Sequence, residues 1–114
     1  MFEKLLGQVI KAIEINEDDT EVKFVTEEKA YVMYHEQDCC ESVYLEDIAG
    51  DLPDLLDSPI IMAEESSQQG PENNESSTWT FYKLATIKGS VTLRWLGTSN
   101  GYYSEDVSFG EVRN

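Results

Sequence analysis

The stretch TWTFYKLATI (residues 78–87), followed by KG (88–89) and SVTLRWL (90–96), decides the fold of this chain. Both runs are rich in β-branched and aromatic residues, and apolar and polar side chains alternate along much of their length. The connection at Lys88-Gly89 is short enough for a tight turn between antiparallel strands. The stretch therefore predicts a β-hairpin.

Similar but shorter segments surround this hairpin on both sides. The segments that read as strands are residues 9–15, 21–26, 30–35, 42–46, 60–65 and about 107–109. A short helical or irregular start precedes Val9, and a short helix is expected at Leu52 to Leu56, where Asp51 is placed to cap it and Pro53 suits its first turn. We predict an α+β fold that is mainly an antiparallel β-sheet of five to seven strands, with one or two short helices.

The chain has 114 residues, which fits a single domain over residues 1–114. Residues 66–77 contain no apolar side chain, so we expect a mobile surface loop there. The longest apolar runs are only a few residues long, so we expect neither a membrane span nor a secretory signal. These features predict a protein of the cytoplasm that does not bind membranes.

Catalytic and metal-binding patterns are sparse. Cys39 and Cys40 are adjacent, and neighbouring cysteines rarely bridge each other, so we expect no disulfide framework and a thiol that packs as a small buried side chain. His35 and Asp38 lie close by, but no second cysteine or histidine pair has the spacing of a zinc site. Neither a nucleophile signature nor a glycine-rich phosphate loop accompanies them. We therefore expect no enzyme activity, no metal and no cofactor.

The net charge of −15 is the strongest feature of the composition. It excludes long-range attraction to nucleic acids or anionic membranes as the main driver of binding, so direct DNA or RNA binding is not expected. Three interpretations remain open: the charge keeps the protein soluble, it imitates the phosphates of DNA, or it reflects a generally acidic host lineage.

The charge is unevenly distributed. Residues 76–104 hold no acid and three cations, so this span carries +3 while the rest of the chain carries −18. Half of the aromatic residues of the chain also lie in the span. Rings stack on nucleobases and cations neutralise phosphates, so this combination favours a small nucleotide ligand. The alternative is that the aromatic residues fill the core, with Trp79 and Phe81, and Leu93 and Trp95, on one parity of each strand.

The candidate ligand-binding residues follow from this span. Arg94 or Lys83 is expected to meet a phosphate, and Tyr102 or Tyr103 to stack on a base. Asn100, in an Asn-Gly turn, and His35, outside the span, are candidates for reading base edges or a second phosphate. For His35 the competing interpretation is a satisfied residue at the end of a strand.

Three segments together resemble a widespread family of small phage and prophage proteins of historically unknown function. They are YHEQDCCESVYLEDI (34–48), WTFYKLAT (79–86) and SNGYY (99–103), which combine an HxxDCC and an SNGYY motif. The resemblance spans most of the chain. It implies phage origin and action in the cytoplasm of an infected bacterium, and it implies no particular chemistry.

Small binding proteins of phages commonly act against host defence, and two classes fit this chain. The first is a sponge, which sequesters the cyclic oligonucleotide signal of an immune system such as CBASS without cleaving it. The second is an acidic DNA mimic that occupies a restriction or CRISPR effector. A structural or regulatory phage factor is a third possibility. The acids cluster in turns such as residues 17–19 and 27–28 rather than in paired rows, so we favour the sponge, as a homo-oligomer built from dimers.

Overall fold

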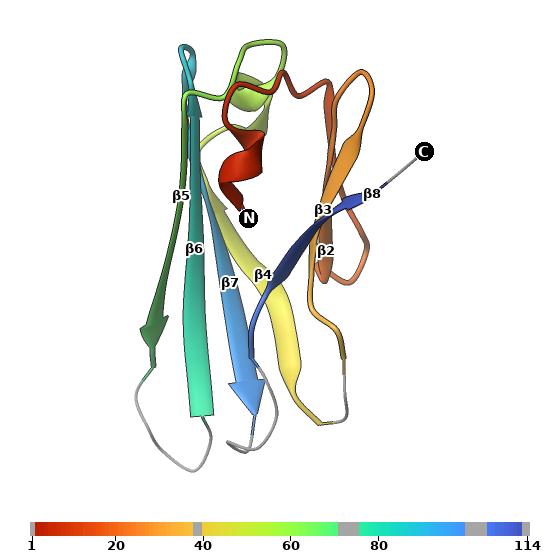
Figure 1. Ribbon diagram of the computed structural model, residues 1–114. Helices are drawn as coiled ribbons and strands as arrows, with labels where there is room; N and C mark the ends of the chain where they lie inside the picture. Colours follow the sequence, from red (N-terminus) through yellow and green to blue (C-terminus); the bar gives the residue numbers. More distant parts are fainter. Residues whose placement is uncertain (1, 38–39, 71–75, 100–104, 113–114) are drawn as a thin grey trace.

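The computed structural model describes residues 2–37, 40–70, 76–99 and 105–112. It contains two four-stranded antiparallel sheets that face each other (Figure 1), in the orders β1-β2-β3-β8 and β4-β7-β6-β5. The strands are β1 (Ala12–Ile15), β2 (Glu21–Val25), β3 (Ala30–Tyr34), β4 (Ser42–Ala49), β5 (Met62–Gln69), β6 (Ser76–Thr86), β7 (Gly89–Ser99) and β8 (Ser108–Val112). Two short 3₁₀ helices, η1 (Phe2–Leu5) and η2 (Leu52–Leu55), complete the described elements.

The long β6–β7 hairpin is the centre of the second sheet. Its register runs without a break from Thr86 opposite Gly89 at the turn to Ser76 opposite Ser99 at the far end. Side chains alternate between the two faces along each strand. Tyr82 and Leu84 of β6 therefore point inward and are buried, together with every second residue of β7 (Val91, Leu93 and Trp95).

The core lies between the two sheets. The first sheet contributes Val22, Phe24, Tyr31 and Met33, all nearly or fully buried. Trp95 crosses the gap, since its indole N–H donates to the sulfur of Met33 at 3.1 Å. At one side Phe2 of η1 packs its ring against Tyr82, with the centroids 4.8 Å apart, and so closes the sandwich there.

The structure confirms a mainly antiparallel β fold with only short helices. It contains eight strands rather than five to seven, and they form two sheets. Its 3₁₀ helix η2 begins at Leu52 as expected. Among the described residues, no helix is long and apolar enough to cross a membrane.

The prediction of a mobile loop at residues 66–77 is wrong at both ends of that segment, where the structure has strands. β5 continues to Gln69, β6 begins at Ser76, and only residues 71–75 between them lie outside the described residues. The strand needs no apolar residues here because β5 is at the edge of the sheet, and its side chains 64–69 are exposed. Pairing with β6, from Glu65 opposite Tyr82 to Gln69 opposite Thr78, holds this polar segment in the sheet.

Burial raises the pKa of Tyr82 above its ordinary value of 10.0, and the nearby carboxylate of Glu65 acts in the same direction. Below pH 10.0 the phenol is protonated in both folded and unfolded chains. Above it the unfolded chain ionises first, so proton linkage favours unfolding as the pH rises. When the pH is raised from neutral to above 10, the free energy of unfolding should fall less for Tyr82→Phe than for the native chain. Denaturant titration at each pH measures this fall. Parallel losses in both proteins would contradict this assignment.

Candidate functional site

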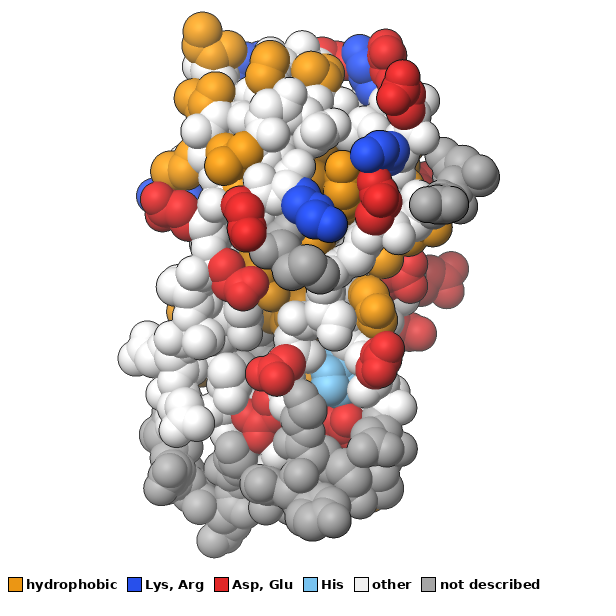
Figure 2. Space-filling model, in the orientation of Figure 1, with side chains coloured by type: hydrophobic (Ala, Val, Ile, Leu, Met, Phe, Trp, Pro, Cys, Tyr) orange, Lys and Arg blue, Asp and Glu red, His pale blue; other side chains and the backbone are white. Residues whose placement is uncertain are grey.

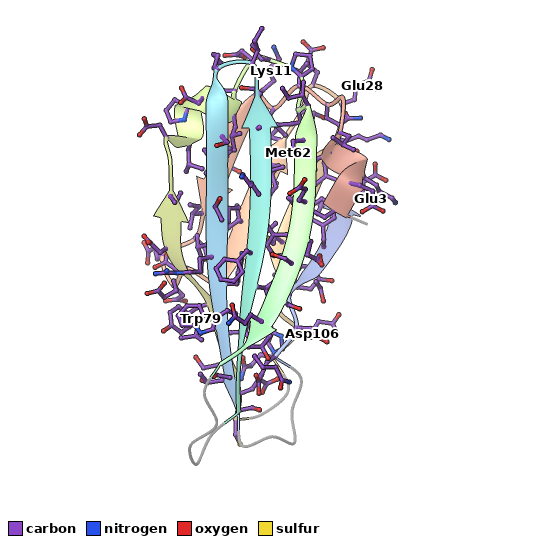
Figure 3. The ribbon with its side chains drawn as sticks, turned by 90° about the vertical axis from the view of Figure 1, so that its left-hand side faces the viewer. Glu3, Lys11, Glu28, Met62, Trp79 and Asp106 are labelled. Atoms are coloured by element: carbon purple, nitrogen blue, oxygen red, sulfur yellow. The ribbon has the colours of Figure 1, made fainter. Side chains whose placement is uncertain are left out.

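The second sheet has a surface turned away from the first sheet, which we call the outer face. Alternation places on it the residues of β6 and β7 that do not enter the core. In Figure 3, which views the molecule from this side, Trp79 lies on the outer face. The residues of β6 and β7 on this face include Trp79, Phe81, Lys83, Thr92, Arg94 and Leu96.

Trp79 and Phe81 are thus not core residues, which corrects the alternative that placed them in the core. The turn sets the register, and Trp79 lies opposite Leu96 while Phe81 lies opposite Arg94. Both rings are half-buried, whereas Trp95 on the next strand is fully buried. The protein therefore presents two aromatic rings on the surface of a central strand.

Arg94 is tightly held on the outer face. Its guanidinium carbon lies 5.2 Å from the centroid of the Trp79 ring, a distance typical of a cation–π contact. Its Nε donates to Glu46 Oε2 at 2.7 Å, and its terminal nitrogen lies 3.5 Å from Asp47 Oδ2. The pairing of β4 with β7 shifts register between Leu45 and Asp47, and both acids reach Arg94. The charge of Arg94 is therefore largely neutralised within the protein.

Two shallow depressions adjoin on the outer face, because Phe81 lines both of them. The first, the tryptophan depression, has a volume of about 230 Å³ and is lined by Gln68, Gln69, Gly70, Trp79, Phe81 and Arg94. The second, the lysine depression, has a volume of about 550 Å³ and is lined by Glu64, Glu65, Ser66, Phe81, Lys83 and Thr92. Together they place the rings of Trp79 and Phe81, the amide of Gln68 and Lys83 along one groove beside β6, with Glu64 opposite Lys83.

Lys83 differs from Arg94 in its electrostatics. Its side chain is exposed, and among the described residues no carboxylate lies within ion-pair distance of its ammonium group. Glu64 is its register partner on β5 and shares the lysine depression with it. Of the two cations on this groove, Lys83 is the one available to an anionic ligand.

His35 does not join this groove, contrary to its expected place in the site. It follows β3 in the other sheet, and its side chain is only 5% exposed. Its Nδ1 donates to the backbone oxygen of Asp106 at 2.7 Å, and its Nε2 lies 2.9 Å from Glu41 Oε2. Figure 2 shows the histidine among acidic side chains. Both ring nitrogens thus face oxygen atoms, and His35 and Glu41 form a buried hydrogen-bonded pair.

Two buried acids near this end of the sandwich could not be singled out in a chain so rich in acids. The side chain of Glu41 is fully buried and accepts a hydrogen bond from Gln37 Nε2 at 3.1 Å. Glu105 is also buried and accepts from the hydroxyl groups of Thr78 and Ser99. These contacts fasten the segments before β4 and β8 to the sheets, which indicates a structural role.

The remaining predicted residues have mixed outcomes. Lys83 and Arg94 do share the outer face, whereas Asn100, Tyr102 and Tyr103 lie outside the described residues. Gln68 and Gln69, which line the tryptophan depression, fall in the loop that the sequence predicts, so the sequence does not identify them as site residues. One feature could have indicated that these two glutamines belong to a strand. β6 extends well beyond the point opposite the last apolar residue of β5, so the rest of β6 needs polar residues of β5 to pair with.

Cys40 also differs from expectation. It is exposed and disulfide-bonded, rather than a buried thiol, and Cys39 lies outside the described residues. In the described part of the chain, no group of three or more His, Cys, Asp or Glu side chains is arranged to hold a metal ion.

Comparison with known proteins gives one assignment. No curated protein and no solved structure matches the chain. Residues 3–109 match the model of a family described as "Domain of unknown function (DUF7448)". That match covers nearly the whole sequence, and the chain belongs to the DUF7448 family.

Proposed function

We propose that the protein is a non-enzymatic binding protein that sequesters a cyclic oligonucleotide signal of a bacterial host on its outer face. The observation that carries this proposal is the pair of adjoining depressions around Phe81, which bring two rings, the amide of Gln68 and an available lysine together. The resemblance to small phage proteins supplies the setting, a host cytoplasm in which an immune signal must be removed.

The groove offers each part of a nucleotide a suitable contact. A base stacks on the half-exposed ring of Trp79, a contact worth about 1–3 kcal/mol. Gln68 lines the same depression opposite Trp79, and its amide both donates and accepts hydrogen bonds, as base edges require. Lys83, in the neighbouring depression, faces the phosphate.

Arg94 has a different role in this proposal from the phosphate contact that the sequence predicted. Because Glu46 and Asp47 already neutralise it, its contribution is to support the indole of Trp79 rather than to bind phosphate. The two carboxylates beside it, and the −18 carried outside residues 76–104, repel long polyanions. A short nucleotide that places its phosphate at Lys83 meets fewer of these acids than a long polyanion, although Glu64 lies opposite Lys83 and Glu65 lines the same depression.

Calorimetry with a panel of cyclic di- and trinucleotides tests the proposal. Trp79→Ala should weaken binding of the best ligand by about 1–3 kcal/mol because a stacking ring is lost. Lys83→Ala should cost about 1.5–3 kcal/mol because a hydrogen bond to a charged group is lost. The matched control is Lys23→Ala, on β2 of the other sheet, which should leave the affinity unchanged.

Two outcomes would count against a nucleotide sponge. One is the absence of heat with every member of the panel. The other is a particular pattern of anti-defence activity among variants. Activity would be lost when the acids of the two predicted turns are neutralised together, and it would be intact in Trp79→Ala and Lys83→Ala. That second result would favour the acidic DNA mimic, whose acids are Glu17, Asp18, Asp19, Glu27 and Glu28.

A further inference from the structure

β5 is an edge strand of the second sheet, and η1 is in contact with it. It pairs with β6 on one side only, over an unbroken register from Met62 opposite Ala85 to Gln69 opposite Thr78. Its side chains from Glu64 to Gln69 are exposed. The strand contains no proline, no lysine and no bulge, which are devices that commonly protect an edge from pairing with another chain.

The register of β5 shows which of its backbone groups face outward. Gly70 continues the ladder, and its N–H donates to the oxygen of Ser77 at 2.9 Å. In an antiparallel ladder, hydrogen-bonded pairs alternate with pairs that are not hydrogen-bonded to each other. The even-numbered residues of β5 therefore direct their backbone groups to β6. Ala63, Glu65, Ser67 and Gln69 direct theirs away from the sheet.

We propose that a second copy of the chain pairs with this edge, β5 against β5, about a two-fold axis through Ser66. Such an axis keeps both outer faces on the same side of the combined sheet. Ser66 then lies opposite Ser66 of the second copy, and Glu65 opposite its Ser67. The outward-facing backbone groups of Glu65 and Ser67, and of Ala63 and Gln69, meet as hydrogen-bonded pairs.

Charge selects this register over its neighbours. With the axis at Ser66, Glu64 lies opposite Gln68 of the second copy, so no carboxylate directly opposes another. An axis at Glu65 would set Glu65 against itself, and like charges directly opposite are destabilising. An axis at Ser67 would leave Met62, Ala63 and Glu64 beyond the end of the partner's strand at Gln69, whereas an axis at Ser66 leaves Met62 alone beyond it. The strand is thus complementary to itself from Ala63 to Gln69.

The dimer joins the two binding grooves. Ser66 lines the lysine depression, so a two-fold axis at Ser66 brings the depressions of both copies together in one eight-stranded sheet. A ligand with repeated units could then contact Lys83 of both chains. The dimer itself does not rest on the proposed function, because its mass is measured without any ligand.

Disulfide trapping tests the register. Residues opposite each other without mutual hydrogen bonds have Cα atoms about 4.5 Å apart, within the range that a disulfide spans. Ser66→Cys should therefore form a covalent dimer under mild oxidation, linked between positions 66 of two chains by peptide mass spectrometry. The matched control is Gln68→Cys, on the same face but about 13 Å from its own copy, which should cross-link about ten-fold more slowly.

The native chain gives a second readout. Light scattering at micromolar concentration should give twice the chain mass of 12.9 kDa. Ser67→Pro should return 12.9 kDa with an unchanged β-sheet circular dichroism spectrum, because it removes an N–H that faces away from β6. A native chain of 12.9 kDa, or equal cross-linking by Ser66→Cys and Gln68→Cys, would overturn the proposal. If Ser67→Pro fails to fold, the cross-linking rates decide.

Discussion

Replacing His35 by alanine should lower the free energy of unfolding by about 3–5 kcal/mol, the range seen when a buried ion pair loses one partner. His35 is 5% exposed and Glu41 is fully buried, and their side chains lie 2.9 Å apart. The substitution removes a hydrogen-bonding partner from a carboxyl group that is out of contact with water. It also removes the donor to the backbone of Asp106, which leads into β8.

A double-mutant cycle separates the buried charge from simple loss of packing. Glu41→Gln keeps the shape of the side chain and removes its charge, so in the His35→Ala background it should recover about 1 kcal/mol or more. Chemical denaturation of the four proteins gives the coupling energy. A loss below about 1 kcal/mol for His35→Ala would show that the pair is a minor contributor.

Truncation of Trp95 to alanine should cost a similar amount, about 3–5 kcal/mol, because its large side chain fills the space between the sheets. Trp95 is fully buried and reaches Met33 of the opposite sheet. The chain supplies its own control in Trp79, which has the same side chain on the neighbouring strand but lies half-exposed on the outer face.

Trp79→Ala should therefore cost much less stability than Trp95→Ala, measured by the same denaturant titration. Trp95→Phe keeps one ring in the core but loses both the indole N–H contact with sulfur and the volume of the second ring, so it should cost about 1–3 kcal/mol. Equal losses of stability for the two alanine variants would contradict the assignment of the two faces.

The two tryptophans also show how far the sequence could predict the fold. Alternation was enough to predict the hairpin, because β-branched and aromatic residues recur through both strands. The face of the sheet on which each side chain lies depends on the register that the turn between β6 and β7 sets. Thr86 pairs with Gly89, so Trp79 lies opposite Leu96 and one step out of register with Trp95, and the two rings point to opposite sides. A shift of one residue reverses every side chain, and composition does not determine it.

The candidate site was predictable in part for a similar reason. Lys83 and Arg94 were identified by an acid-free span, and they do share one face. The neutralisation of Arg94 comes from a register irregularity in β4, which brings Glu46 and Asp47 to it from far away in the sequence. Chemical type is the one feature of the sequence that points to His35, whereas its burial depends on contacts with Glu41 and the backbone of Asp106.

The most direct test of the binding account uses the native protein without any assumed ligand. The protein is purified from infected cells, denatured by heat, and the released small molecules are identified by mass spectrometry. We predict release of a cyclic oligonucleotide, in an amount strongly reduced for Trp79→Ala and Lys83→Ala and unchanged for Lys23→Ala. Release of no nucleotide from the native protein, or equal release from all four proteins, would contradict the account.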